Sequence, residues 1–249
     1  MMGRIAVIVV GAGSGERFGG SENKIFAKLD GQPLFLRALQ LFVNREDVCQ
    51  TVLVVAPADM DQVKGKYGPN IGFMGAELVA GGNKRHESVA NGLAKVREEA
   101  ECIAVHDAAR VCVSALWIDA IFEAAARDGS AVPVVPVNAT LKRIGKDKTV
   151  EETVPRTGLF LAQTPQVFRA DLLRSAYEKQ QAGQLAISAP ITDDAQLVAA
   201  AGHRVCTVAG DPRNIKITAR GDLPLARAIL RTLPQKKVDR LGTFEEAKW

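Results

Sequence analysis

The chain has 249 residues, 47% of them hydrophobic and 24% charged, with a formal net charge of +4. That composition is typical of one globular domain with a sizeable core, expected over 1–233, followed by a charged tail over 234–249. The charge is too small and too dispersed to predict binding to nucleic acid. No stretch approaches the roughly 18 apolar residues of a membrane span.

Over the first part of the chain, apolar strand-like runs alternate with helical patterns. Strands are expected at 5–10, 51–56, 76–80, 102–106 and 131–137, and helices at about 33–44, 58–67, 86–99 and 114–128, the last with Ser114 as its N-cap. This alternation predicts an α/β fold with a mostly parallel, twisted sheet and helices on both faces. Ligands of such sheets bind at the carboxyl ends of the strands, so the segments that follow these strands are expected to meet in one crevice.

The alternation breaks over 138–160, a polar stretch that predicts a projecting β-hairpin with its turn near 145–148. The hairpin is either an arm that packs on another subunit or a long solvated loop. Beyond it, the patterns predict a strand over 159–168, helices over 170–182 and 192–201, short strands over 204–208 and 214–218, and a last helix over 222–233. The tail is expected to be loose or to form an oligomer contact.

The four cysteines predict neither a metal site nor a redox pair, since none of them forms a Cys-x-x-Cys motif. Cys102 and Cys206 lie in apolar runs, where a cysteine packs as a small apolar side chain. Such thiols favour a reducing, cytoplasmic location. The apolar run 5–10 leads straight into a glycine-rich loop and is not typical of a signal peptide.

That glycine-rich loop, Gly11-Ala12-Gly13-Ser14-Gly15, follows the first strand and precedes two cations, Arg17 and Lys24. Glycines at alternate positions let the backbone turn sharply and present its N–H groups to an anion. The loop is therefore interpreted as a cradle for a polyanion such as a nucleoside triphosphate, the alternative being a plain strand-to-helix turn.

The glycine spacing excludes three common phosphate loops. A dinucleotide fingerprint requires glycine where Glu16 or Phe18 stands, and a P-loop requires lysine where Ser21 stands. The kinase glycine-rich loop fails at the same positions as the dinucleotide fingerprint, and no His-Arg-Asp or Asp-Phe-Gly motif follows. The loop thus predicts a different class of nucleotide site.

Two more motifs follow other strands of the predicted sheet. Gly81-Gly82-Asn83 precedes a helix on which Ser88 offers a hydroxyl group, an arrangement that suits ligand binding or a capping turn. Asp107, at the end of a buried strand, suits Mg²⁺ or a substrate hydroxyl, and Arg110 suits a phosphate. His106 is more typical of a hydrogen-bonded structural residue than of a catalytic one. No serine or cysteine nucleophile motif accompanies it, which disfavours acyl transfer.

The remaining candidates follow the predicted hairpin or lie within it. Lys216 lies between two isoleucines on the expected strand over 214–218, and alternation would turn it away from both neighbours towards the crevice. Three polar residues lie in or near the hairpin: Thr140, Arg156 and Thr164.

Taken in order, these motifs resemble the 2-C-methyl-D-erythritol 4-phosphate cytidylyltransferase family over about residues 5–230. The motifs are the 11–17 loop, Lys24, Gly81-Gly82 with Ser88, Val105–Arg110, Thr140, Arg156, Thr164-Pro165-Gln166, Thr192-Asp193 and Asn214–Thr218. The resemblance implies a Rossmann-like nucleotidyltransferase fold and a homodimer formed through the 138–160 arm. It also implies Mg²⁺ as divalent cation and cytidylyl transfer from CTP to 2-C-methyl-D-erythritol 4-phosphate with release of pyrophosphate.

The resemblance also implies residue roles. Arg17 and Lys24 would stabilise the transition state, and Arg156 and Lys216 would position the sugar phosphate, with Arg156 reaching across from the partner's arm. The implied nucleotide-binding residues are Gly11, Ala12, Gly13, Ser14, Gly15, Gly82, Asn83 and Ser88, and the implied substrate-binding residues are Asp107, Arg110, Thr140 and Thr164, with Asp107 also the metal ligand.

The chain departs from the family's usual residues at several positions. Asn23 and Ile25 flank Lys24 where the family usually has Pro and Gln, Val111 replaces a Pro, and Asn83 and Ala139 each replace an Asp. Because Ala139 adjoins a substrate-side residue, ribitol 5-phosphate stays open as the alternative acceptor. From other classes, a nucleotide-binding regulatory protein and a dinucleotide-dependent oxidoreductase are the competing hypotheses. The retained cations disfavour the first of these, and the failed fingerprints disfavour the second.

Overall fold

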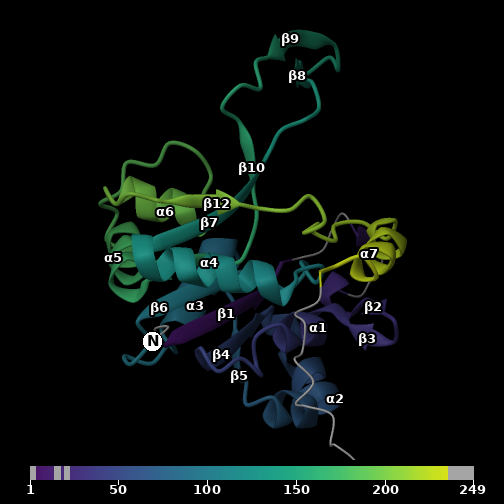
Figure 1. The fold of residues 1–249 in the computed structure, drawn as a ribbon, viewed down its shortest axis with the longest axis vertical. Coiled ribbons are helices and arrows are strands. Elements are labelled where there is room, and N and C mark those ends of the chain that lie inside the picture. Colours follow the sequence, from purple (N-terminus) through teal and green to yellow (C-terminus); the bar gives the residue numbers. More distant parts are fainter. Residues whose placement is uncertain (1–3, 14–17, 20–22, 235–249) are drawn as a thin grey trace, which may run out of the picture.

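A computed structural model describes residues 4–13, 18–19 and 23–234. The described residues form a central mixed sheet of eight strands in the order β10-β7-β11-β6-β1-β4-β5, with β12 paired to β7 (Figure 1). Its parallel half consists of β1 (Ile5–Gly11), β4 (Val48–Val55), β5 (Glu77–Ala80) and β6 (Cys102–Asp107). The prediction of a mostly parallel α/β sheet is confirmed.

Helices cover both faces of the sheet. Successive residues of a strand point to opposite sides, and in β1 the side chains on both sides are apolar and need to be covered. Val7 and Val9 of β1 belong to the core beneath α1 (Leu34–Gln40), α2 (Met60–Phe73) and α4 (Ala115–Asp128). Ala6 and Ile8 belong to the core beneath α3 (Arg85–Leu93), α5 (Ala170–Gln181) and α6 (Asp194–Ala200). This strand thus contributes to two cores, which explains its almost continuous apolar sequence.

The second half of the sheet is mixed. β10 (Phe160–Ala162) and β11 (Gln166–Arg169) run antiparallel to β7 (Ser130–Pro136), whereas β12 (Thr207–Ala209) runs parallel to it. The single strand predicted over 159–168 is therefore two strands. β10 pairs with the C-terminal end of β7, whereas β11 lies between β6 and the N-terminal end of β7. The change of position interrupts the strand at 163–165.

The predicted hairpin is confirmed. β8 (Leu141–Ile144) pairs with β9 (Val150–Val154), and the turn between them is closed by backbone bonds from Gly145 to Thr149 and from Lys148 to Gly145. The hairpin stands clear of the body at the top of Figure 1. Short elements complete the fold: η2 (Lys24–Phe26), β2 (Lys28–Leu29), β3 (Gln32–Pro33), η3 (Pro57–Asp59) and α7 (Asp222–Leu230).

Several predicted boundaries are wrong. The helix expected over 86–99 ends at Leu93, since the Gln50 side chain bonds to the Arg97 N–H and the Lys95 carbonyl and takes these groups out of a helix. The helix expected over 58–67 continues to Phe73, and those expected over 33–44 and 222–233 end at Gln40 and Leu230. The strand expected over 204–208 begins only at Thr207.

The strand predicted over 214–218 does not form. Its backbone instead crosses the ends of other elements, where Ile217 N–H donates to the Ala109 carbonyl and the Asn214 carbonyl accepts from Arg110. The predicted tail lies outside the described residues from position 235 onward.

The cysteines are free thiols within the described part of the chain. Cys102 is buried as predicted, while Cys206 is only partly buried. Burial raises the pKa of the Cys102 and Cys112 thiols to about 11. Across 4–13, 18–19 and 23–234, no helix is both long and apolar enough to cross a membrane.

Candidate active site

The predicted crevice exists as a pocket of about 740 Å³ at the carboxyl ends of the parallel strands. The glycine-rich loop after β1, the turn after β5 and the end of β6 all contribute to its wall. Among the predicted site residues, those that line it are Gly11, Ala12, Gly13, Lys24, Gly82, Asn83, Ser88, Asp107 and Lys216. Segments far apart in sequence therefore meet, as the strand order requires.

The turn after β5 needs its two glycines because two other segments lie against it. A Cβ atom at Gly81 would come within 2.6 Å of the Ala12 Cβ, and one at Gly82 within 2.5 Å of the Glu87 Cβ. The Gly82 N–H donates to Ser88 Oγ over 3.1 Å, and the Asn83 N–H donates to the Glu87 carboxylate over 2.9 Å. Ser88 and Glu87 thus cap this turn, and the same contacts bring the Gly82 backbone to the pocket wall.

Asp107 is the centre of the pocket's electrostatics. Its Oδ2 lies 2.6 Å from Lys216 Nζ and 3.8 Å from Arg110 Nε, and its Oδ1 lies 3.4 Å from Arg85 Nε. Burial on its own would raise the pKa of this carboxyl group, but Arg85 and Lys216 outweigh it and hold the pKa well below the usual range. The pocket therefore contains an ionised carboxylate surrounded by cations.

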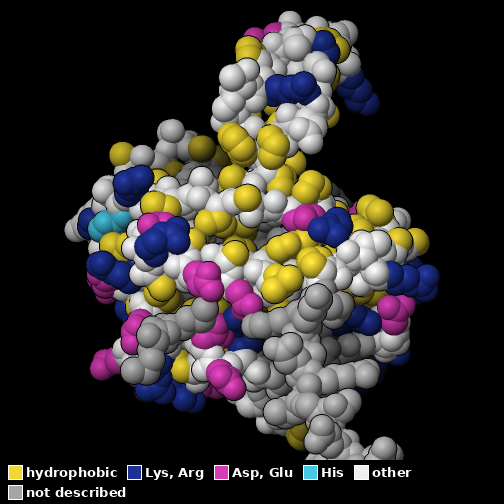
Figure 2. Space-filling model, viewed as in Figure 1, with side chains coloured by type: hydrophobic (Ala, Val, Ile, Leu, Met, Phe, Trp, Pro, Cys, Tyr) yellow, Lys and Arg dark blue, Asp and Glu magenta, His cyan; other side chains and the backbone are white. Residues whose placement is uncertain are grey.

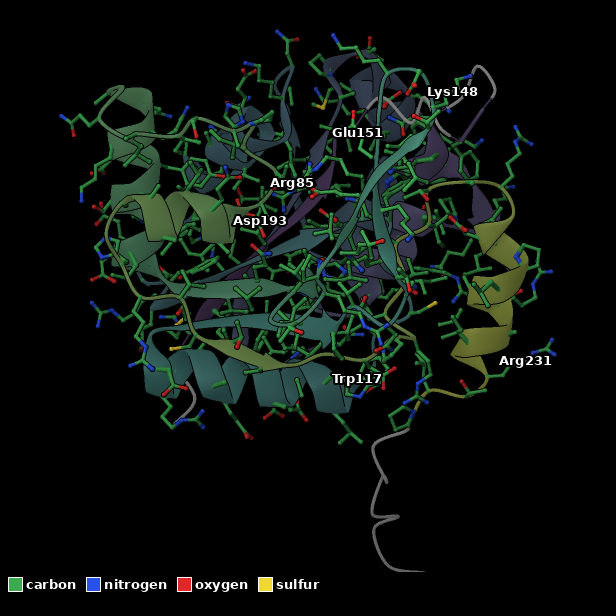
Figure 3. The ribbon with its side chains drawn as sticks, turned by 90° about the horizontal axis from the view of Figure 1, so that it is seen from above. Arg85, Trp117, Lys148, Glu151, Asp193 and Arg231 are labelled. Carbon is green, nitrogen blue, oxygen red and sulfur yellow. The ribbon has the colours of Figure 1, made fainter. Side chains whose placement is uncertain are left out.

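A second buried carboxylate holds Arg85 in place. Asp194, at the start of α6, is fully buried and accepts from Arg85 Nη1 over 2.8 Å and from the Tyr177 hydroxyl over 2.7 Å. Although burial opposes it, the two aspartates raise the pKa of the Arg85 guanidinium above its ordinary value. In the view of Figure 3, from above, the labels of Arg85 and of Asp193, which precedes Asp194, lie near the middle of the picture, and that of Arg231 lies at its edge.

This chain of ion pairs was not predicted from the sequence. Arg85 lies within a motif singled out for its glycines, and the only visible signal was its charge at the start of a helix. Nothing in the sequence pairs it with Asp194, 109 residues away.

His106 has the structural role that was the favoured interpretation. Its ring is fully buried, Nε2 donates to the Arg110 carbonyl over 2.8 Å, and Nδ1 lies 3.2 Å from Thr164 Oγ1. Burial lowers the pKa of His106 to about 4, so the ring is neutral near pH 7. Thr164 Oγ1 in turn accepts from the Asp107 N–H, and the buried ring thereby supports the segment that carries the carboxylate.

Acidification should destabilise the fold through His106. As pH falls, the unfolded imidazole, with a pKa near 6.5, takes up a proton before the folded one, whose pKa is about 4. We expect this group to remove on the order of 3 kcal/mol from the free energy of unfolding between about pH 6.5 and 4. In urea unfolding at several pH values, the gap between wild type and His106→Gln should narrow towards pH 4. A gap that stays constant would contradict the assignment.

The structure places the other predicted residues away from the open pocket. Arg110 Nη1 donates to the Asn214 carbonyl over 2.6 Å, and Thr164 is buried behind the end of β6. Thr140 and Arg156 are exposed on the segments that lead to the hairpin, where Arg156 donates to the Asn138 carbonyl; neither lines the pocket of its own chain. Ser14, Gly15 and Arg17 lie outside the described residues.

A mixed α/β sheet whose strand ends hold a glycine-walled, cationic pocket around one carboxylate is typical of nucleotide-dependent group transfer. A family profile described as IspD: 2-C-methyl-D-erythritol 4-phosphate cytidylyltransferase matches residues 5–232. The chain belongs to this family.

Relatives and solved structures agree with that assignment. The chain is 40% identical over 237 residues to the 2-C-methyl-D-erythritol 4-phosphate cytidylyltransferase of Rhodopirellula baltica, covering 91% of this chain and 94% of the relative. It is 37% identical over 228 residues to the enzyme of the same name from Alkaliphilus metalliredigens, covering 91% and 93%. The crystal structure of the Thermus thermophilus enzyme of that name matches with a TM-score of 0.71 at 33% identity, covering 93% of this chain and all of that one. The resemblance drawn from the motifs is confirmed, and the ribitol alternative is not favoured.

Proposed function

We propose that this chain transfers the cytidylyl group of CTP to 2-C-methyl-D-erythritol 4-phosphate, giving 4-diphosphocytidyl-2-C-methyl-D-erythritol and pyrophosphate for isoprenoid precursor synthesis. The observation that carries the proposal is the family membership over 5–232 of a chain whose pocket retains Lys24, Asp107 and Lys216. The family's activity is a nucleotidyl transfer, so the oxidoreductase and regulatory alternatives have no support.

The chemistry requires positioning and charge neutralisation more than acid–base catalysis. An oxygen of the sugar phosphate attacks the α-phosphorus of CTP, and the bond to the bridging oxygen of pyrophosphate breaks. The attacking oxygen is already anionic, so no general base is required, which agrees with a neutral, buried His106. Arg17 and Lys24 would neutralise charge that develops on the transferring group, and Lys216, held by Asp107, would orient the attacking phosphate.

We assign the nucleotide to the glycine side of the pocket, at Gly11–Gly15, Gly82, Asn83 and Ser88. The sugar phosphate is assigned to the side of Asp107 and Lys216, with Arg110 and Thr164 supporting Asp107 from outside the pocket lining. Two features support this division. Gly11, Gly13 and Gly82 line the pocket without a side chain, so a triphosphate can approach the backbone there, and the cations gather around Asp107.

Asp107 fits a Mg²⁺ ion that is held largely by the substrate. Mg²⁺ sites in nucleotide enzymes combine one or two carboxylates with phosphate oxygens. Asp107 Oδ1 has a long 3.4 Å contact with Arg85, and no cluster of three or more His, Cys, Asp or Glu that could hold a metal occurs within the part of the chain that the structure describes. Asp107 would therefore supply one ligand and the triphosphate the others; when bound, the ion offsets the negative charge of the triphosphate.

A substrate panel tests the proposed activity directly. Pyrophosphate release is measured with CTP, UTP or ATP, each combined with 2-C-methyl-D-erythritol 4-phosphate or ribitol 5-phosphate in the presence of Mg²⁺. Only the combination of CTP with 2-C-methyl-D-erythritol 4-phosphate should give high turnover. CTP binding without pyrophosphate release from any combination would overturn the proposal in favour of a regulatory protein.

Residues 1–233 are proposed to form a single domain. The arm over 138–160 is proposed to make the contact between two copies of this domain in a homodimer. Apolar side chains are exposed on the hairpin and on β10 at its base, with Ile144 53%, Phe160 56% and Leu161 58% accessible, and Figure 2 shows hydrophobic side chains gathered where the arm joins the body. Such exposure on a projecting element is typical of a subunit interface. Because Thr140 and Arg156 do not line their own pocket, the dimer would deliver them to the pocket of the partner.

We expect Leu161→Lys to shift the protein from dimer to monomer in analytical ultracentrifugation, because burying a lysine at an apolar contact is costly. The KM for the sugar phosphate should rise in the same variant, while Phe73→Lys, at an exposed apolar residue far along the chain, should change neither property. A wild type that is monomeric and fully active at assay concentrations would contradict the dimer proposal.

A further inference from the structure

Asn23 uses every hydrogen-bonding group of its side chain. Its Nδ2 donates to the Gly13 carbonyl over 3.0 Å and to Asp59 Oδ2 over 2.8 Å, and its Oδ1 accepts from the Ile25 N–H over 3.3 Å. Both donors face acceptors and the oxygen faces a donor, so the amide has one consistent orientation. The bond to Asp59 has an ionised acceptor and is of the stronger kind.

These bonds join three segments of the pocket wall. Gly13 belongs to the glycine-rich loop after β1, Lys24 follows Asn23 at the start of η2, and Asp59 ends η3 after β4. Gly13 and Lys24 both line the pocket, as does Pro57 of η3. The Asn23 side chain therefore connects the glycine-rich loop, called the glycine wall below, to the segment that carries Lys24.

We propose that Asn23 is a positioning residue for nucleotidyl transfer in this chain, and that with Gly13 and Asp59 it forms a clasp that fixes the distance between the glycine wall and Lys24. The clasp acts through Gly13 and Lys24 and does not itself touch the substrate. This proposal rests on the proposed function, in which the pocket holds the triphosphate of CTP.

The backbone conformation of Asn23 allows a substitution that removes its side-chain bonds and leaves the path of the chain unchanged. Its φ of −60° and ψ of 138° are values that proline also adopts, and proline is the residue that the family usually has there. A proline at this position would keep the path of the chain but lose all three side-chain bonds. Asn23→Pro therefore isolates the contribution of the side-chain bonds.

Two substitutions separate the clasp from ordinary helix capping. Asn23→Ser keeps a good N-cap acceptor for the Ile25 N–H, but its side chain is too short to reach Gly13 and Asp59 together. Asn23→Asp also keeps the acceptor, but places a carboxylate against the Asp59 carboxylate and the Gly13 carbonyl. In Asn23→Asp/Asp59→Asn, the amide is moved to position 59 and can donate to the carboxylate at 23.

The test measures kcat, the KM for CTP, and the temperature of unfolding for these variants, for the single variants Asp59→Asn and Asn23→Pro, and for Asn91→Ser. Asn91 is a matched control, since its amide donates to the Ala80 carbonyl over 2.9 Å and does not line the pocket. We expect kcat/KM for CTP to fall about ten-fold in Asn23→Ser and Asn23→Pro and further in Asn23→Asp, with part of the loss restored in the double variant. Asn91→Ser should match the wild type.

Wild-type values of kcat/KM in Asn23→Ser and Asn23→Pro would overturn the clasp. So would a loss of kcat/KM in the double variant that equals the losses of Asn23→Asp and Asp59→Asn combined. A fall in kcat/KM that is matched by unfolding at the assay temperature would likewise assign Asn23 to stability alone. A wild type that does not turn over CTP would overturn the proposed function instead, so the two failures are distinguishable.

Discussion

Lys24→Ala should lower kcat for cytidylyl transfer by about 10²–10³-fold. Loss of one preorganised contact to the charge that develops in a transition state costs roughly 3–4 kcal/mol. Lys24 lines the same pocket as Asp107 and Lys216, at the start of η2. Saturating both substrates isolates kcat from changes in binding, so the loss should persist at high CTP concentration.

Arg17→Ala should produce a loss of the same size, an expectation that rests on the family resemblance because Arg17 lies outside the described residues. Lys28→Ala is the matched control, since Lys28 is exposed on β2 and does not line the pocket. Near-normal kcat in both Lys24→Ala and Arg17→Ala would remove the proposed transition-state role.

The second large effect concerns stability. Arg85→Leu should lower the free energy of unfolding by about 3–5 kcal/mol, because it leaves Asp194 buried without its cation. Asp194 is 0% exposed and would retain the Tyr177 hydroxyl and polar contacts that cannot neutralise its charge. Urea unfolding monitored at constant pH gives the free energy directly.

A partner substitution shows whether the unpaired charge causes this loss. In the Arg85→Leu background, Asp194→Asn removes the buried charge while keeping an acceptor for Tyr177, and part of the stability should return. Two results would show that the ion pair does not stabilise the fold as described. Arg85→Leu could lower the free energy of unfolding by less than about 1 kcal/mol, or Asp194→Asn could lower it in the Arg85→Leu background by as much as it does in the wild type.

The strands and the crevice could be predicted because local pattern determines them. The run 5–10 is apolar on both faces because both faces of β1 are covered by helices, and that signal needs no tertiary information. Once the parallel order is assumed, the carboxyl ends of β1, β5 and β6 must lie at one edge of the sheet. That the glycine-rich loop, Gly82 and Asp107 line one pocket therefore follows from the sequence alone.

Lys216 shows how a correct placement can follow from a wrong premise. The alternation around it predicted a strand, but the segment over 214–218 forms none in the structure. Its neighbour Ile217 is nevertheless fully buried and bonds to the Ala109 carbonyl, while Lys216 reaches Asp107. Two-residue alternation reports which side of the chain is buried, and an irregular segment across the end of a sheet satisfies it as well as a strand does.

Long-range polar pairs could not be predicted. Asp194, Tyr177 and Arg85 come from three helices, and each is an ordinary helix residue by local criteria. Only the packing of α5 and α6 beside α3 makes Asp194 a buried charge that needs a cation. The same holds for Asn23, whose partners Gly13 and Asp59 are brought together by the order of β1 and β4 in the sheet.

The most direct test of the central claim follows the oxygen atoms of the acceptor. The enzyme is supplied with CTP, Mg²⁺ and 2-C-methyl-D-erythritol 4-phosphate labelled with ¹⁸O in its phosphate group, and the products are analysed by mass spectrometry. Attack of that phosphate on the α-phosphorus predicts equal amounts of pyrophosphate and 4-diphosphocytidyl-2-C-methyl-D-erythritol, with all the label in the latter. Label in pyrophosphate, or pyrophosphate formed without the cytidylyl product, would contradict the account.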